Sequence, residues 1–110
     1  MDKIDFNFDK KTAVITGGAQ GFGLDIAKRF LNSGAKVIIW DIDPKMIEKS
    51  IKDLNNSNLS SNIVDVSNYN QVEKCVTEIT KDSNIDILIN NAGITGPTST
   101  LWEYDIEMWK

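Results

Sequence analysis

The stretch Thr16–Gly23, which reads TGGAQGFG, constrains the fold of this chain more than any other feature. A short apolar run, Ala13–Ile15, precedes it, and an amphipathic run, Leu24–Leu31, follows it. The segment therefore predicts a strand, a glycine turn and the start of a helix in immediate succession. The first turn of a helix presents unpaired N–H groups and the positive end of the helix dipole, so such a turn is suited to binding a phosphate group.

Three glycines of this stretch have separate expected roles. Gly17 can adopt the backbone angles needed to leave the strand sharply. Gly21 has no side chain, so a pyrophosphate can approach the backbone there, and Gly23 lets the helix lie close to the sheet. The spacing is G-x-x-x-G-x-G rather than the G-x-G-x-x-G of the common dinucleotide-binding fingerprint. Taken alone, the glycines could also form an ordinary turn between a strand and a helix.

Length and composition exclude several classes of function. The chain has 110 residues, a net charge of −4, one cysteine and no histidine. Such a length corresponds to one domain at most. The lack of histidine excludes Ser-His-Asp catalysis, Cys-His catalysis and most zinc chemistry. A single cysteine excludes an internal disulfide and a cysteine-rich zinc site. We therefore predict no metal site. A negative net charge without a basic patch argues against a nucleic-acid partner.

The distribution of apolar residues bears on location. No apolar run approaches the roughly 20 residues that a membrane helix needs. Residues 1–11 mix charged, polar and aromatic side chains, so they do not look like a signal peptide. We therefore expect no membrane partner and a cytoplasmic protein.

Strand-like and helix-like patterns alternate along the chain. Strands are expected at Thr12–Thr16, Lys36–Asp41, 59–66 and Ile85–Asn90. Helices are expected at about 21–33, with an apolar face of Phe22, Ile26, Ala27, Phe30 and Leu31, then after Asp43-Pro44, after Ser67-Asn68, and from Asp105. This alternation predicts parallel strands joined by right-handed crossovers. The expected fold class is α/β, a Rossmann-type doubly wound parallel sheet of about four strands in the order 3-2-1-4, with helices on both faces.

In such a sheet, a ligand binds beyond the carboxyl ends of the strands, where the strand order reverses. Asp41 ends the second strand and follows Gly23 by 18 residues, near the offset of about 20 at which an acidic residue holds the adenosine ribose. Its carboxylate would repel a 2′-phosphate, and neither Ile42 and Asp43 after it nor Gln20 is basic. We therefore predict NAD rather than NADP as the cofactor. Taken alone, Asp41 could be a solvated turn residue.

The other strand ends are polar as well. Asp65 could accept a hydrogen bond from an adenine amino group while Val66 packs on the ring, although Asp65 alone fits a turn or a helix cap equally well. Trp40 is expected against the sheet or beside the adenine pocket. In the string 90–93, which reads NNAG, the asparagines can bridge neighbouring loops and the Ala-Gly pair leaves room for a sugar. The same string could be a simple turn.

Together, T-G-x-x-x-G-x-G at 16–23, Asp41, Asp65 and N-N-A-G at 90–93 resemble the short-chain dehydrogenase/reductase family, whose members have a single-domain Rossmann fold. The likeness runs from about residue 10 to residue 110, and its last part looks like 3-oxoacyl-carrier-protein reductase-like and sugar-acid dehydrogenase-like members. The resemblance implies hydride transfer between a nicotinamide cofactor and an alcohol or ketone, in a homodimer or homotetramer. The predicted cofactor-binding residues are Gly17, Gln20, Gly21, Phe22, Gly23, Asp41, Ile42, Asp65, Val66, Asn91, Ala92 and Gly93.

The chain departs from this family in its catalytic groups. The family's active site has an Asn, a Ser and a Tyr-x-x-x-Lys pair, in which the Tyr is the general acid/base with its pKa lowered by the Lys. Here Tyr69 is followed four residues later by Glu73, and Tyr104 by Met108. We therefore assign no catalytic residue and expect residues 1–110 to be one NAD(P)-binding domain, incomplete at its C-terminus and inactive alone.

Two other functions fit parts of the sequence. The first is a non-catalytic nucleotide-binding module that is complete at this length. Against this function, the apolar strand 85–90 would then be an open edge of the sheet, and such edges promote aggregation. A flavodoxin-like or receiver-type domain fits less well, because such a sheet would not need Asp41 together with this glycine spacing.

Overall fold

The computed structural model describes residues 8–91 of the chain. Strands and helices alternate in this part: β1 (Thr12–Thr16), α1 (Gly21–Asn32), β2 (Lys36–Asp41), α2 (Pro44–Leu54), β3 (Leu59–Ile63), α3 (Tyr69–Thr80) and β4 (Ile87–Asn90). The helix expected from Asp105 lies outside the described residues. No described helix has the length and apolarity that spanning a bilayer requires.

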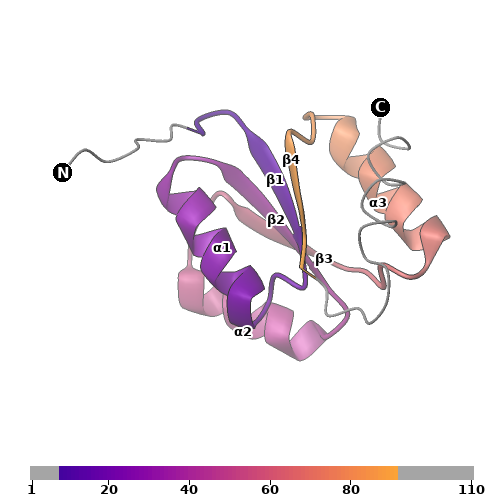
Figure 1. Ribbon diagram of the computed structural model, residues 1–110, viewed down its shortest axis with the longest axis horizontal. Coiled ribbons are helices and arrows are strands. Elements are labelled where there is room, and N and C mark those ends of the chain that lie inside the picture. The colour runs from indigo at the N-terminus through magenta and orange to yellow at the C-terminus, as the bar shows by residue number, and fades with distance from the viewer. Residues whose placement is uncertain (1–7, 92–110) are drawn as a thin grey trace.

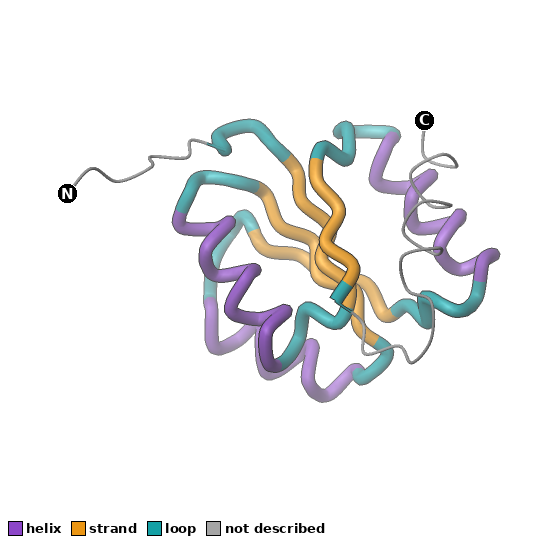
Figure 2. Tube along the Cα trace, in the orientation of Figure 1, coloured by secondary structure: helices purple, strands orange, loops and turns teal. Residues whose placement is uncertain are grey.

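The strands of the described residues form one sheet in the order β3-β2-β1-β4, which confirms the predicted order. All three strand pairs are parallel, and Val14 at the centre of β1 lies opposite Ile38 of β2 and Leu88 of β4. Figure 2 shows the strands running through the middle of the molecule, with helices and loops around them. Parallel pairing requires long crossovers, and here each crossover contains one helix.

Helices cover both faces of the sheet, as predicted: α1 and α2 lie on one side and α3 on the other (Figure 1). Successive residues of a strand point to opposite faces, and β1 shows this directly. Ile15 belongs to a core cluster with Ala27 of α1 and Ile47 of α2, whereas Val14 belongs to a second cluster with Val72 of α3. Because both faces are covered, all residues of β1 are buried.

β3 is shorter than the sequence analysis predicted. It ends at Ile63, because the opposite residue on β2 is Asp41, after which the chain turns into α2. The amide of Val64 still donates to the Asp41 carbonyl at 3.0 Å. The expectation that the strand extends to Asp65 and Val66 is therefore wrong, and both residues lie in the loop that follows β3.

The fourth strand also differs from the prediction at one end. β4 begins at Ile87, two residues later than expected, and pairs there with Ala13 of β1. One backbone hydrogen bond precedes the strand, from the Asp86 amide to the Thr12 carbonyl at 2.9 Å. The Thr12 amide donates to the Asp86 carboxylate at 2.9 Å. Thr12 is the first residue of β1, so Ile85 has no residue of β1 opposite it.

The start of the apolar face of α1 was predicted wrongly. Gly23, Ala27 and Leu31 are its buried residues, whereas Phe22 is 80% exposed. Gly23 lies against the glycine turn, because a Cβ at this position would collide with the Gly17 carbonyl oxygen. Consecutive residues of a helix point in different directions, so the side chain of Phe22 points to another side of α1, where it is exposed.

α2 begins where the sequence predicts, at Pro44 with Asp43 as the N-cap. The Asp43 carboxylate accepts hydrogen bonds from the amides of Lys45 at 3.0 Å and Met46 at 3.3 Å. It thereby satisfies two of the amides that a helix N-terminus leaves without partners.

Asp43→Ala should therefore lower the free energy of unfolding by about 1 kcal/mol. Asp53→Ala is the matched control, because it removes the same charge near the C-terminal end of the same helix, where a carboxylate opposes the helix dipole. The control should be neutral or slightly stabilising. Urea unfolding at neutral pH measures both changes, and equal losses of stability in the two variants would contradict the capping role.

Candidate functional site

A cavity of about 530 Å³ lies at the carboxyl ends of the strands. Its walls come from the turn after β1, the end of β2, the loop after β3 and the residue after β4, which parallel pairing brings to one edge of the sheet. These connections are among the teal segments of Figure 2. The described lining residues are Gly17, Gln20, Gly21, Phe22, Trp40, Asp41, Ile42, Val64, Asp65, Val66 and Asn91.

Most of the residues predicted from the sequence line this cavity. Gly23 does not; it lies beneath the turn, where a Cβ would be 2.8 Å from Nδ2 of Asn91. Ala92 and Gly93 lie outside the described residues. Trp40 both packs in the core and lines the cavity. Val64 was missed, because its place in an apolar pair at the end of a strand suggested only a core residue.

The glycine turn is attached to β2 through the backbone. The amides of Gly17 and Gly18 both donate to the Trp40 carbonyl, at 2.7 and 3.3 Å. Gly18, to which the sequence analysis gave no role, lies so close to β2 that a Cβ would be 2.6 Å from Cγ2 of Ile39. Gly21, at the start of α1, has a φ of +58°, a left-handed conformation that favours glycine.

The carboxylate of Asp41 connects this turn to the start of α2. Oδ2 accepts a hydrogen bond from the Ala19 amide at 3.2 Å, and Oδ1 accepts one from the Asp43 amide at 3.2 Å. The side chain is only 6% exposed, so it is not a solvated turn residue. Each carboxylate oxygen can accept a second hydrogen bond. Asp41 is therefore fixed by two amides and keeps the capacity to accept from a ligand in the cavity that it lines.

Asp65 is held by a residue of its own loop. Its Oδ1 accepts hydrogen bonds from the Ser67 hydroxyl at 2.6 Å and from the Ser67 amide at 3.0 Å. The bond from the hydroxyl, and to a smaller extent the bond from the amide, holds the pKa of Asp65 below its usual value of 3.8. The side chain is thus ionised at neutral pH and offers a hydrogen-bond acceptor at the cavity wall.

Thr16 connects the ends of β1 and β4 at the edge of the cavity. Its hydroxyl donates to Oδ1 of Asn90 at 3.0 Å and accepts from the Asn91 amide at 2.8 Å. The side-chain amide of Asn91 is 3.5 Å from the Gly17 carbonyl. Asn90 therefore joins the ends of the two strands, and Asn91 bridges the loops that follow them. Bridging of neighbouring loops is one of the two roles that the sequence suggested.

The arrangement is suited chemically to a nucleotide. No side chain caps the N-terminus of α1, so the amides of its first turn lack the side-chain acceptor that α2 and α3 have at the same place, and this end of α1 suits an anion. The carboxylates of Asp41 and Asp65 accept from hydroxyl or amino groups, and Val66 adds apolar surface. Within residues 8–91, no cluster of acidic or cysteine side chains could hold a metal ion.

Comparison with known proteins identifies the family. The family model for short chain dehydrogenases matches residues 11–110. The chain belongs to the short-chain dehydrogenase family. This confirms the resemblance carried by the glycine and N-N-A-G motifs and excludes the flavodoxin-like and receiver-type alternatives. The family binds NAD or NADP, acts on small-molecule substrates and is commonly oligomeric.

Several relatives of known name share this similarity. The 3-oxoacyl-(acyl-carrier-protein) reductase FabG of Chlamydia pneumoniae is 40% identical over 95 residues, which are 84% of this chain and 38% of that protein. The uncharacterized oxidoreductase YxbG of Bacillus subtilis (strain 168) is 39% identical over 105 residues, 92% of this chain and 38% of that protein. One similar solved structure is the crystal structure of 3-ketoacyl-(acyl-carrier-protein) reductase from Brucella melitensis complexed with NADH. The match has a TM-score of 0.73 and 36% sequence identity, and it covers 80% of this chain and 36% of that protein chain. The chain thus spans about 38% of the length of these curated relatives.

Ser67→Ala should raise the pKa of Asp65 toward 3.8, because the hydroxyl bond is lost while the amide bond remains. Because the pKa of Asp65 is lower in the folded state than in the unfolded state, its ionised carboxylate stabilises the fold. This stabilisation is fully present above a pH of about 4 and is lost as the pH falls through the lowered pKa. NMR titration of the Asp65 carboxyl carbon measures the shift. Thr77→Ala, which removes a hydroxyl bonded to the Glu73 carbonyl, should leave it unchanged. An Asp65 pKa that does not move in Ser67→Ala would refute the assignment.

Proposed function

We propose that this chain is the cofactor-binding portion of an oxidoreductase that transfers hydride between NAD(H) and an alcohol or ketone. Asp41 carries the proposal: a buried carboxylate at the end of β2, fixed by two amides on the cavity wall. Such a carboxylate can accept hydrogen bonds from both hydroxyls of the adenosine ribose, and it repels a 2′-phosphate. None of the described lining residues is Lys or Arg, so none could neutralise that phosphate.

The remaining lining residues suit the other parts of NAD. The pyrophosphate is proposed to lie at the turn 17–23 and the first turn of α1, with Gln20 and Phe22 beside it. A Cβ at Gly21 would meet no atom within 4 Å, so the backbone there is open to approach. The adenosine half is assigned to Ile42, Asp65 and Val66. The second half of the cofactor is assigned to Asn91, and to Ala92 and Gly93 outside the described residues.

The chemistry of the bound cofactor is hydride transfer at the nicotinamide, and the role of this chain is to bind and orient it. The described residues offer no proton donor in the family's pattern. The hydroxyl of Tyr69 donates to the Glu73 carboxylate at 3.1 Å on an exposed part of α3 and does not line the cavity. Three predictions concern the whole protein: a small alcohol or ketone as substrate, a homodimeric or homotetrameric assembly, and a cytoplasmic location. We also propose that residues 1–110 are part of a single domain whose catalytic groups lie outside them.

Asp41→Ala should weaken NAD binding by about 1–3 kcal/mol and NADP binding much less, because charge-assisted hydrogen bonds to the ribose hydroxyls are lost. Calorimetric titration of the full-length protein with each cofactor measures this, with thermal unfolding to verify that the variant folds. Asp53→Ala is the matched control, since it removes the same charge from the far end of α2 and Asp53 does not line the cavity. Equal losses for both cofactors in Asp41→Ala would show that Asp41 does not bind the ribose.

Residues 1–110 expressed alone should not oxidise any alcohol with NAD, because the sequence holds no Tyr-x-x-x-Lys pair. Absorbance of NADH at increasing protein concentration measures turnover. Rates that rise with the concentration of purified protein would place a proton donor within these residues and overturn the assignment of no catalytic residue.

A further inference from the structure

Ser50 of α2 is a buried polar residue, 2% exposed. Its Oγ lies 2.8 Å from the Met46 carbonyl oxygen of its own helix and 2.7 Å from the Ala19 carbonyl oxygen of the glycine turn. The first contact is a local one that serine often makes in helices. The second joins α2 to a residue 31 positions earlier in the chain.

The hydroxyl has one proton, so the two carbonyls compete for it. The Met46 carbonyl has a second donor, because in an α-helix the backbone amide of the residue four positions later, here Ser50 itself, donates to it. Ala19 lies before α1 begins and is 1% exposed, so water cannot readily replace a lost donor there. The Ala19 carbonyl is therefore the acceptor that depends on Ser50.

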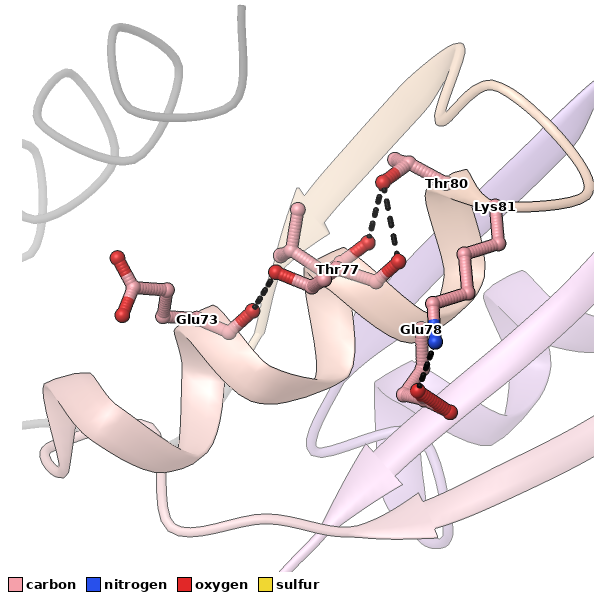
Figure 3. Close-up of polar contacts among 6 residues, drawn as sticks. Glu73, Thr77, Glu78, Thr80 and Lys81 are labelled. Atoms are coloured by element: carbon pink, nitrogen blue, oxygen red, sulfur yellow. Dashed lines mark hydrogen bonds and ion pairs between the residues drawn. The ribbon is translucent and has the colours of Figure 1, made fainter.

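Two threonines of α3 show the same local contact without the long-range one. The hydroxyls of Thr77 and Thr80 are bonded within α3 (Figure 3). The Thr77 hydroxyl donates to the Glu73 carbonyl at 2.9 Å, and the Thr80 hydroxyl lies 2.8 Å from the Val76 carbonyl and 3.3 Å from the Thr77 carbonyl. Neither hydroxyl contacts the glycine turn in the described structure. Removal of the Thr80 hydroxyl is thus a control for loss of a helix-internal hydrogen bond.

Ser50 and Asp41 hold the same residue of the turn from two sides. The Ala19 amide donates to Oδ2 of Asp41 at 3.2 Å, while the Ala19 carbonyl accepts from Ser50. When the Ser50 bond is removed, the Ala19 carbonyl loses its side-chain donor, and the peptide groups around Ala19 are held less firmly. The position of the Ala19 amide, which donates to one of the two oxygens of Asp41, therefore depends in part on Ser50.

We propose that Ser50 is a positioning residue for cofactor selectivity: it holds Ala19 so that the Ala19 amide keeps the Asp41 carboxylate directed for ribose binding. The inference rests on the proposed binding of NAD. A carboxylate that changes its orientation accepts less well from the ribose hydroxyls and repels a 2′-phosphate less strongly. Loss of Ser50 therefore changes the ratio of the NAD and NADP affinities, which a general loss of stability does not.

The test compares Ser50→Ala and Thr80→Val in the full-length protein, with dissociation constants for NAD and NADP measured by calorimetry. Ser50→Ala should weaken NAD binding by about 3- to 10-fold and NADP binding less. Thr80→Val should leave both constants within about 2-fold of the wild type. Unchanged NAD affinity in Ser50→Ala, or equal losses for both cofactors, would overturn the proposal. If Ser50→Ala does not fold, Ser50→Cys, which is similar in size and a weak donor, replaces it with the same expected direction.

Hydrogen exchange without cofactor separates this inference from the proposed function. Ser50→Ala should speed exchange of the Ala19 amide and leave that of Ile39, in the centre of β2, unchanged. Unchanged exchange at Ala19 would refute the role of Ser50 in holding the turn. A wild-type protein that binds neither NAD nor NADP would refute the proposed function and, with it, the role of Ser50 in selectivity, whatever the exchange at Ala19.

Discussion

The attachment of the glycine turn to the end of β2 is the constraint on which the site depends. The Trp40 carbonyl accepts two amides of the turn, and the Asp41 carboxylate accepts a third from Ala19. This approach is possible because Gly18 has no side chain to meet Ile39. The start of α1 is thereby held beside the strand end that carries Asp41, so an anion-binding helix terminus and a carboxylate share one cavity.

The two carboxylates of the cavity are stabilised in different ways. Asp41 is buried, and its two hydrogen bonds come from the amides of Ala19 in the glycine turn and of Asp43 just before α2. Asp65 lies in an exposed loop, where the hydroxyl and amide of Ser67 keep its pKa low. A cavity with this charge favours ligand groups that donate hydrogen bonds near β2 and β3, whereas the amides at the start of α1 favour a negative group. A dinucleotide has both kinds of group along its length.

The sequence predicted the elements and their order well, and it predicted most of the residues that surround the cavity. Asp43 with Pro44 predicted the start of α2, and the apolar runs 13–15 and 37–40 predicted the two central strands. The errors concern positions that depend on a distant partner. β3 ends at Ile63 because β2 turns away there, and Phe22 is exposed because α1 packs closely through Gly23. Neither partner is visible in the local pattern of residues.

The sequence by itself thus determined the strand–helix alternation, the caps and the residues at the strand ends, because these follow from periodicity and from interactions between near neighbours. Only the tertiary structure decided which residues form hydrogen bonds with one another. The bonds from Ser50 to Ala19, from Thr16 to Asn90 and from Gly18 to Trp40 join residues far apart in the chain. Hydrogen bonds of this kind need distances near 3 Å. Such distances arise only after the helices have packed on the sheet, so no short pattern in the sequence specifies them.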